Sequence, residues 1–451
     1  MTKRTQTQKF ICFALWSLAW LSTHSHAETP ATDVEGEWLC HTPSVSVNRA
    51  ASHYVSIQNG ILQTDTVDTD MQLTPTGDGR YSGTWIGQPS THASRQLVLQ
   101  APGTLTYSDH VTGDLAHNTV TTQCERLGNI TQTQPTAHPP AWQTIRLAQA
   151  HPTQPALGYD QIYAKQARYR DTQSGSNQWK KSFDDWCQIS GLGGVRKKTV
   201  TAASQLNQPQ SFACQKKAKN RDIHALKTAV IGPGGKLYMT DGHHSLSSLW
   251  EAPLRQGDDR TGTVQGNITI PVRIQADYQH LNNASFWRAM RAQGYTWLQD
   301  PHGDAITPAA LPQQFGLKQG LKDDPYRSLV YFTRGVGHQV PEDAPEFTEF
   351  HWATWLKSAP RNFDLGHYQL HQIGAGNGSD HGYLQAIHDA ALLMTQAPAT
   401  ETIGASGRTA QEMGQLPTPD MQALQELATQ ASAPGKLTQA LHYRQQHAPK
   451  D

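Results

Sequence analysis

The stretch Tyr238–Trp250 reads YMTDGHHSLSSLW and joins an extended pattern, a glycine turn and a helical pattern in one short segment. Upstream, KTAVIGPGGKLYMTD (Lys227–Asp241) predicts two strands around a Gly-Pro-Gly-Gly turn. After Asp-Gly, the apolar residues Leu246, Leu249 and Trp250 have helical spacing. The sequence therefore predicts a strand–turn–helix unit.

Two adjacent histidines, His243 and His244, open the predicted helix. The first N–H groups of a helix have no partner within it, so this end attracts anions, and Gly242 permits a tight turn. Imidazole titrates near neutral pH, but a helix N-terminus disfavours its charged form. We therefore expect neutral rings, one acting as general base and one supporting it, with Asp241 orienting a ring. A purely structural pair is the alternative.

The first residues have the features of a secretory signal peptide, 1–27. Lys3, Arg4 and Lys9 precede the apolar run Phe10–Leu21, and the Ser-His-Ala that ends at Ala27 suits signal peptidase. The run is too short for a membrane helix, and no later run is long and apolar enough. The chain has 37 basic and 37 acidic residues, so loss of the three signal cations leaves a net charge near −3. We expect a periplasmic or secreted protein.

Four cysteines follow the signal, and an even number in an oxidising compartment favours disulfides. Four cysteines allow three pairings. We expect Cys40–Cys124 and Cys187–Cys214, because each pair brackets one coherent segment. The close C-x-x-C spacing that is typical of zinc sites is absent from the sequence.

Residues 28–128 have a β pattern. HYVSIQNGILQTD (His53–Asp65) is two alternating runs around Asn-Gly, the strongest short hairpin signal. Similar runs follow, with Gly and Pro at the turns. We expect a small antiparallel barrel or sandwich, closed by the first disulfide. The Pro-, Gln- and Thr-rich residues 129–156 are typical of an extended linker.

A basic segment follows, which contains twelve Lys and Arg residues and only three acidic residues, Asp171, Asp184 and Asp185. Such a cluster is typical of a phosphate or nucleic-acid contact, and the alternative is a solvated face. Lys197 and Lys198 are candidate phosphate contacts. The basic residues are Lys165, Arg168, Arg170, Lys180, Lys181, Arg196, Lys197, Lys198, Lys216, Lys217, Lys219 and Arg221.

The segment GGKLYMTDGHHSLSSLWEA (Gly234–Ala252) resembles the signature turn of the ParB/sulfiredoxin superfamily. More narrowly, it is similar to the ParB-like nuclease family, whose members carry an Asp-Gly-His-His turn. DDPYRSLVYFTRG, from Asp323, and FTEFHWATWL, from Phe347, resemble that family's downstream blocks. The resemblance covers residues 157–395 and leaves a polar helical tail, 396–451. It implies a small α/β fold with a helical C-terminal part, a phosphate-binding strand–turn–helix, and nuclease activity.

One position departs from the superfamily pattern. In sulfiredoxins and ParB proteins the turn ends in an Arg that holds nucleotide phosphates, and here that position is Ser245. The departure counts against binding of ATP or CTP. Arg327 is a candidate replacement, because Asp324 can cap a helix opened by Pro325 and place Arg327 on its first turn. There it can grip a phosphate with two hydrogen bonds.

Two alternatives stay open downstream. Arg327 could instead form a salt bridge to Asp323 or Glu349. Glu349 lies among aromatic residues, where burial would raise its pKa and make it a candidate acid or base. The alternative for Glu349 is a helix-surface position.

The sequence favours a multidomain α+β protein that hydrolyses a phosphoester, with nucleic acid as one candidate substrate. A second hypothesis is a non-enzymatic binding module for an anionic ligand. A third is phosphoryl transfer from a nucleotide. No cofactor is assigned, a divalent metal being one candidate, and the oligomeric state is left open.

Overall fold

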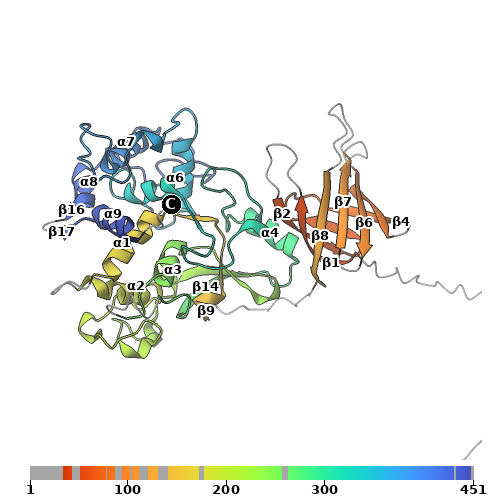
Figure 1. Cartoon of the computed structure of the whole chain (residues 1–451), viewed down its shortest axis with the longest axis horizontal. Helices are drawn as coiled ribbons and strands as arrows, with labels where there is room; N and C mark the ends of the chain where they lie inside the picture. The colour runs from red at the N-terminus through yellow and green to blue at the C-terminus, as the bar shows by residue number, and fades with distance from the viewer. Residues whose placement is uncertain are drawn as a thin grey trace, which may run out of the picture.

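The computed structural model describes residues 34–42, 51–77, 79–86, 94–101, 104–110, 120–130, 141–171, 177–255, 263–430 and 433–447. The expected signal peptide, 1–27, lies outside these residues. Within them, no helix has the length and apolar character needed to cross a membrane. Figure 1 shows two parts, a β barrel on the right and a larger α/β part on the left.

The N-terminal part is a closed antiparallel barrel, which confirms one of the two folds expected for it. β1 pairs with both β2 and β8, so the sheet has no free edge. Asn59 and Gly60 connect β2 to β3 with positive φ angles of 53° and 71°, as an Asn-Gly hairpin requires. The strands are β1 (Gly36–Thr42), β2 (Ala51–Gln58), β3 (Ile61–Thr64), β4 (Met71–Gly77), β5 (Arg80–Trp85), β6 (Ser94–Ala101), β7 (Thr104–His110) and β8 (Val120–Gly128).

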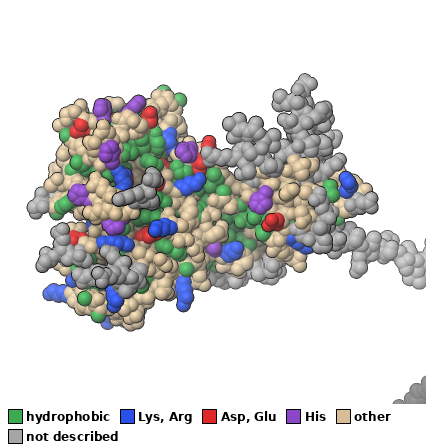
Figure 2. All heavy atoms as spheres, in the orientation of Figure 1, with side chains coloured by type: hydrophobic (Ala, Val, Ile, Leu, Met, Phe, Trp, Pro, Cys, Tyr) green, Lys and Arg blue, Asp and Glu red, His purple; other side chains and the backbone are tan. Residues whose placement is uncertain are grey.

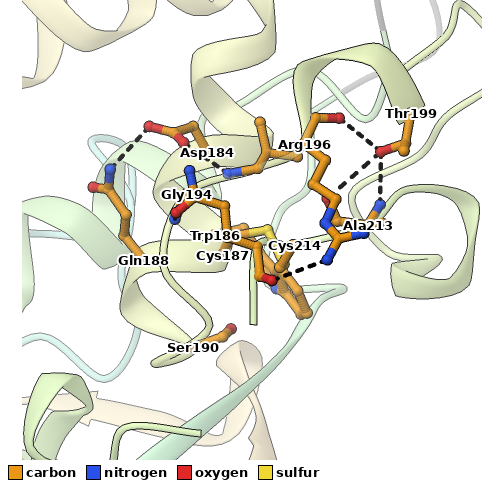
Figure 3. Close-up of a disulfide and its surroundings, with 12 residues drawn as sticks. Asp184, Trp186, Cys187, Gln188, Ser190, Gly194, Arg196, Thr199, Ala213 and Cys214 are labelled. Atoms are coloured by element: carbon orange, nitrogen blue, oxygen red, sulfur yellow. Dashed lines mark hydrogen bonds between the residues drawn. A yellow bond between two sulfur atoms is a disulfide. The ribbon is translucent and has the colours of Figure 1, made fainter. Parts of the chain in front are cut away.

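Both expected disulfides are present. Cys40 and Cys124 lie opposite each other on β1 and β8, so the first bridge joins the two strands that close the barrel. The second joins Cys187, on α2 (Lys181–Ile189), to Cys214. Figure 3 shows this bridge beneath the loop that carries Arg196. The second disulfide therefore ties the loop that carries Arg196, Lys197 and Lys198, called the basic loop below, to the core of the α/β part.

The α/β part is built around a five-stranded mixed sheet in the order β10-β13-β12-β14-β9. The strands β12 and β13 form the predicted antiparallel pair across the Gly-rich turn. On either side, β10 runs parallel to β13 and β14 parallel to β12. The strands are β9 (Trp142–Arg146), β10 (Ala150–Pro152), β12 (Lys227–Ile231), β13 (Leu237–Met239) and β14 (Thr269–Asp277).

The structure differs from the sequence pattern in the segment read as a linker, 129–156. Here β9 and β10 are edge strands of the sheet, and β11 (Ala156–Leu157) pairs with β15 (Lys322–Asp323). Ile145, Leu147 and Ala150 are buried in the core between the sheet and its helices. A few apolar residues at the right spacing thus order a segment whose overall composition is polar.

The helices cover the sheet and form a second core. α3 (His243–Trp250) packs with α2 against the sheet, whereas α5 to α9 gather around α1. The polar tail contributes to this core, because Leu437, Ala440 and Leu441 of α9 are buried. The remaining helices are α1 (Tyr159–Tyr169), α5 (Pro325–Phe332), α6 (Thr348–Lys357), α7 (Tyr383–Gln396), α8 (Met421–Ala428) and α9 (Lys436–His447), and the pair β16 (Thr429–Gln430) and β17 (Ala433–Pro434) follows α8.

Helix α4 (Asn283–Ala292) lies between the sheet and the barrel (Figure 1). Its apolar face, with Phe286 and Met290, packs with the sheet residue Val230. Its polar face contacts the barrel: the Arg288 guanidinium lies 2.5 Å from an Asp70 carboxylate oxygen and donates to the Thr64 carbonyl at 2.8 Å. The amphipathic helix therefore joins the two parts.

Candidate functional site

The strand–turn–helix unit forms as the sequence predicts. β13 ends at Met239, α3 begins at His243, and Gly242 connects them with a left-handed φ of 88°. A Cβ atom at Gly242 would lie 2.7 Å from Cγ of Lys227. Glycine is therefore required here both by the backbone angle and by the space available.

The His243 ring is fixed by a backbone group. Its Nε2 accepts a hydrogen bond from the Thr153 N–H at 3.0 Å, while the Thr153 hydroxyl donates to the Met239 carbonyl at 2.7 Å. Burial lowers the pKa of His243 to about 3, against the attraction of Asp241. The ring is neutral at physiological pH, as the sequence predicts, and the proton resides on Nδ1.

His244 is held in the same way. Its Nε2 accepts from the Gly158 N–H at 2.9 Å. Burial, followed by the positive charge of Arg327, lowers the pKa of His244 well below its ordinary value. In both histidines the Nε2 lone pair is occupied, so neither ring has a free lone pair while its proton stays on Nδ1. The contacts therefore favour a donor role over the expected role of general base.

Arg327 lies on the first turn of α5, where Asp324 caps the helix by accepting its backbone N–H at 3.0 Å. The predicted cap is thus confirmed. The side chain is 4% exposed, and burial lowers its pKa to about 9, so it remains a cation. Nη2 lies 3.1 Å from Oε2 of Glu349, and the guanidinium carbon lies 5.6 Å from the centre of the Phe350 ring.

Arg327 also faces His244. Its Nη2 lies 3.3 Å from His244 Nδ1, the nitrogen that carries the proton when Nε2 accepts from Gly158. Two donors then point at each other, which is unfavourable unless a third group accepts from both. Nε and Nη1 of Arg327 are buried and have no hydrogen-bond partner among the described residues. The cluster therefore lacks acceptors.

Glu349 is buried on α6 and not on the helix surface, with 7% exposure. It contacts Arg327 through one oxygen and Arg334 through the other. Two guanidinium groups favour the charged carboxylate, so its contacts suit a positioning role for Arg327 better than proton transfer. The sequence leaves open two roles for Arg327, a phosphate contact and a salt bridge. The salt bridge to Glu349 is present, and it leaves two guanidinium nitrogens of Arg327 unpaired for an anion.

Asp241 pairs with Lys227, whose Nζ lies 2.8 Å from Oδ2. Burial raises the pKa of Asp241, but Lys227 and the Gly242 N–H outweigh this effect, so its pKa lies below the ordinary value. The carboxyl is therefore charged. The sequence predicts that Asp241 orients a histidine ring, whereas the hydrogen bonds that hold the two rings come from the backbone of Thr153 and Gly158.

These groups line one cavity of about 150 Å³. Gly242 and Ser245 also line it, and the Ser245 hydroxyl accepts from partly buried Lys165 at 3.5 Å. The structure thus brings together the predicted residues Asp241, Gly242, His243, His244, Ser245, Arg327 and Glu349.

The basic loop does not contribute to this cavity. Lys197 and Lys198 are exposed on the short turn Lys197–Thr199. Lys197 lines a different groove, of about 380 Å³, together with Lys180 and Lys436. Figure 2 shows several Lys and Arg side chains on the visible face of the α/β part. Any contact of the loop with an anion would therefore lie outside the cavity.

Several cavity residues have no clear signal in the sequence. Gln154 comes from the segment read as a linker, and Lys227 lies fourteen residues before its partner Asp241. Arg334 lies within the block that begins at Asp323, and Glu346 directly precedes the block that begins at Phe347. Their place in or beside these blocks is the only sequence signal that points to them. Among the described residues, no three His, Cys, Asp or Glu side chains gather where they could hold a metal ion.

Comparison with known families matches residues 143–358 to a family described as "Putative ParB-like nuclease". The match supports the resemblance of this region to ParB-like nucleases. The match begins in β9 and extends just past α6, so it includes every element that lines the cavity and excludes the barrel.

Comparison with curated proteins finds no match. Among solved structures, protein Atu1540 from Agrobacterium tumefaciens aligns over 55% of this chain and 88% of its own. The TM-score is 0.34 and the sequence identity 18%, a similarity too low to define a role for any residue of the ParB-like region.

Proposed function

We propose that the cavity binds the phosphoryl group of a phosphoester and that the protein hydrolyses it, with nucleic acid as one candidate substrate. One observation carries the proposal: a buried Arg327 with two unpaired nitrogens faces a histidine donor at 3.3 Å. A phosphate oxygen between Arg327 and His244 would accept from both groups. The family match to nucleases supports the same chemistry.

The anion site combines three kinds of donor. The N-terminal N–H groups of α3 follow Gly242 and suit an anion. His243 and His244 supply Nδ1–H groups on rings that are held rigidly, and Arg327 supplies a full positive charge. Donors that are fixed before the substrate binds stabilise developing negative charge without reorganisation. Glu349 holds Arg327 in place.

We also propose that the protein works in an oxidising compartment, periplasmic or secreted. Two disulfides support this location, because such bridges are rare where thiols are kept reduced. Fractionation of the native host, followed by peptide mapping without reductant, tests the location. Recovery of the protein in the reducing cytoplasm with free thiols would contradict it.

Anion binding tests the first half of the functional proposal. Calorimetry with sulfate, which does not titrate near neutral pH, should give a 1:1 complex with wild type. Arg327→Gln should weaken it roughly 10- to 150-fold, since hydrogen bonds to charged groups contribute about 1.5–3 kcal/mol. Arg408→Gln, which removes a surface partner of Asp343, is the matched control and should bind as wild type does.

Turnover tests the second half. A phosphodiester, a phosphomonoester and single- and double-stranded DNA should be assayed with and without divalent metal. Hydrolysis that Arg327→Gln impairs and Arg408→Gln does not would support the proposal. If wild type binds sulfate but hydrolyses none of these substrates, the non-enzymatic binding module takes its place.

A further inference from the structure

Glu346 is a cavity residue to which neither the sequence motifs nor the anion site gives a role. It lies two residues before α6 and lines the same cavity as His243, His244 and Arg327. It is only partly buried, so its carboxyl can meet water inside the cavity. The backbone around it is unusual, because the next residue, Phe347, has a left-handed φ of 59°.

Phe347 is held in that conformation by ring contacts. Its ring centre lies 6.1 Å from that of His243 and 6.3 Å from that of Trp297. A bulky residue with positive φ costs on the order of 1–3 kcal/mol and persists only where surrounding contacts enforce it. The strained residue thus fixes the direction in which Glu346 enters the cavity.

The charges around Glu346 differ from those around Asp241. Burial, and after it the nearby charge of Asp241, raise the pKa of Glu346 to about 7, against a hydrogen bond from Gln275. Lys227 and Arg273 are the cations that face it, and they lower the pKa less. Asp241 itself has a pKa below its ordinary value. When two carboxyl groups in one site have pKa values shifted in opposite directions, they typically take different roles, one exchanging a proton and the other staying charged.

We propose that Glu346 is the general base of the hydrolysis, an inference that rests on the proposed function. The site needs such a group, because the Nε2 lone pairs of His243 and His244 are occupied and Glu349 is bound by two arginines. Among the groups that line the cavity, Glu346 combines a carboxyl, access to water and a fixed backbone.

The step balances without a further reactant. The oxygen of a water molecule forms a bond to phosphorus while one of its protons passes to the Glu346 carboxylate. The phosphorus–oxygen bond to the alcohol breaks, and the leaving oxygen takes a proton from solvent. Glu346 then returns its proton to solvent. Arg327, His243 and His244 hold the non-bridging oxygens.

The test is the pH dependence of kcat/KM for a phosphodiester with Glu346→Gln. Wild-type kcat/KM should rise with pH and level off above about pH 7, because the carboxylate is the active form. Glu346→Gln should lose about 10²–10⁴-fold and the pH dependence with it. Glu346→Asp keeps the carboxyl and should retain more activity. Glu342→Gln, an exposed change on the same loop, is the control.

Sulfate binding separates this inference from the proposed function. Glu346→Gln should bind sulfate at least as tightly as wild type, because it removes a carboxyl and no donor. Active wild type with Glu346→Gln within threefold of its activity would overturn the role of Glu346 and leave the function standing. Wild type that binds sulfate without turnover would overturn both. Loss of sulfate binding in Glu346→Gln would assign the residue to structure and not to catalysis.

Discussion

At the scale of single residues, the site depends on which ring nitrogen carries a proton. Backbone N–H groups of Thr153 and Gly158 occupy Nε2 of His243 and His244, so both rings are donors. A carboxylate in place of either ring would repel a phosphate group, whereas a neutral imidazole N–H donates a hydrogen bond to it. Burial that prevents protonation thus keeps the hydrogen-bond pattern of the site constant over a wide pH range.

The first prediction concerns the charge of His243. Because burial lowers its pKa to about 3, its ring should stay neutral from pH 8 down to pH 5. Nuclear magnetic resonance of labelled imidazole rings checks this, with His243→Gln for assignment. The ring of His367, whose side chain is 77% exposed, serves as the solvent-accessible control. A His243 signal that titrates between pH 6 and 7 would contradict the donor assignment.

The predictable residues are those whose signals are local. The neighbouring residues predict the turn at Gly242 after Asp241 and the Asp324 cap of α5. Both are present where expected. The donor to His243 is different, because Thr153 lies 90 residues away in a segment of polar composition. Every residue except proline has a backbone N–H, so the sequence does not show which of these groups binds a histidine ring. The donor role of the two rings could therefore not be predicted from the sequence.

At the scale of elements, the turn before α3 sets the anion site. Gly242 has a positive φ and leaves no room for a Cβ beside Lys227. The Lys227–Asp241 pair and the first N–H groups of α3 therefore depend on one glycine. The strand, turn and helix were each predictable from periodicity, whereas the pairing of Lys227 with Asp241 required the sheet register.

The second prediction separates strain from space at this turn. Gly242→Ala should destabilise the protein by about 1–2 kcal/mol through backbone strain, and further because Lys227 must move. Gly234→Ala is the matched control, with a φ of 69° and nothing within 4 Å of the added Cβ, so only strain remains. Thermal unfolding and sulfate affinity measure the two effects. Equal losses in both variants would show that the contact with Lys227 is unimportant.

The third prediction concerns the contact between the barrel and α4. Asp65 is buried, which raises its pKa from 3.8 to about 7, against the smaller effects of Tyr54, Arg291 and Arg288. The folded state therefore binds a proton between pH 4 and 7 that the unfolded state has lost, and stability falls as pH rises through this range. Asp65→Asn should remove that fall, on the order of 2–4 kcal/mol at pH 8.

Thermal unfolding from pH 4.5 to 8 measures the effect for Asp65→Asn and for a control, Asp68→Asn. The Asp68 side chain is 85% exposed although it pairs with Arg291 at 3.1 Å, so its removal should leave the pH dependence unchanged. Parallel curves for wild type and Asp65→Asn would show that the carboxyl is not a stability determinant.

At the scale of the whole molecule, a barrel and an α/β part are joined by α4, and their separate folds were predictable from strand periodicity and the Asp-Gly-His-His turn. The attachment was not. Arg288 and Asp70 are far apart in sequence, and neither stands out from other charged residues. The segment 142–152 forms edge strands where the sequence predicts a linker, because edge strands need few apolar residues and the overall composition of the segment is polar.

The basic loop is the remaining whole-molecule feature, since it lies outside the cavity and on the same α/β part. Other cations of the basic segment are paired, as Lys165 of α1 and Lys181 of α2 are with Asp185. Arg196, Lys197 and Lys198 are exposed, on a loop anchored by the second disulfide (Figure 3). These three cations are therefore accessible to a polyanion at the surface of the α/β part.

The last prediction is that this array contributes to nucleic-acid binding. Affinity for duplex DNA should fall steeply with salt, and replacing Arg196, Lys197 and Lys198 by Gln should flatten the log–log slope by up to about 2.7, or 0.9 per phosphate contact. The control replaces three exposed cations elsewhere, Arg80, Lys236 and Lys318, by Gln. An equal change of slope in both triple variants would reduce the loop to a solvated face, as would no binding at low salt.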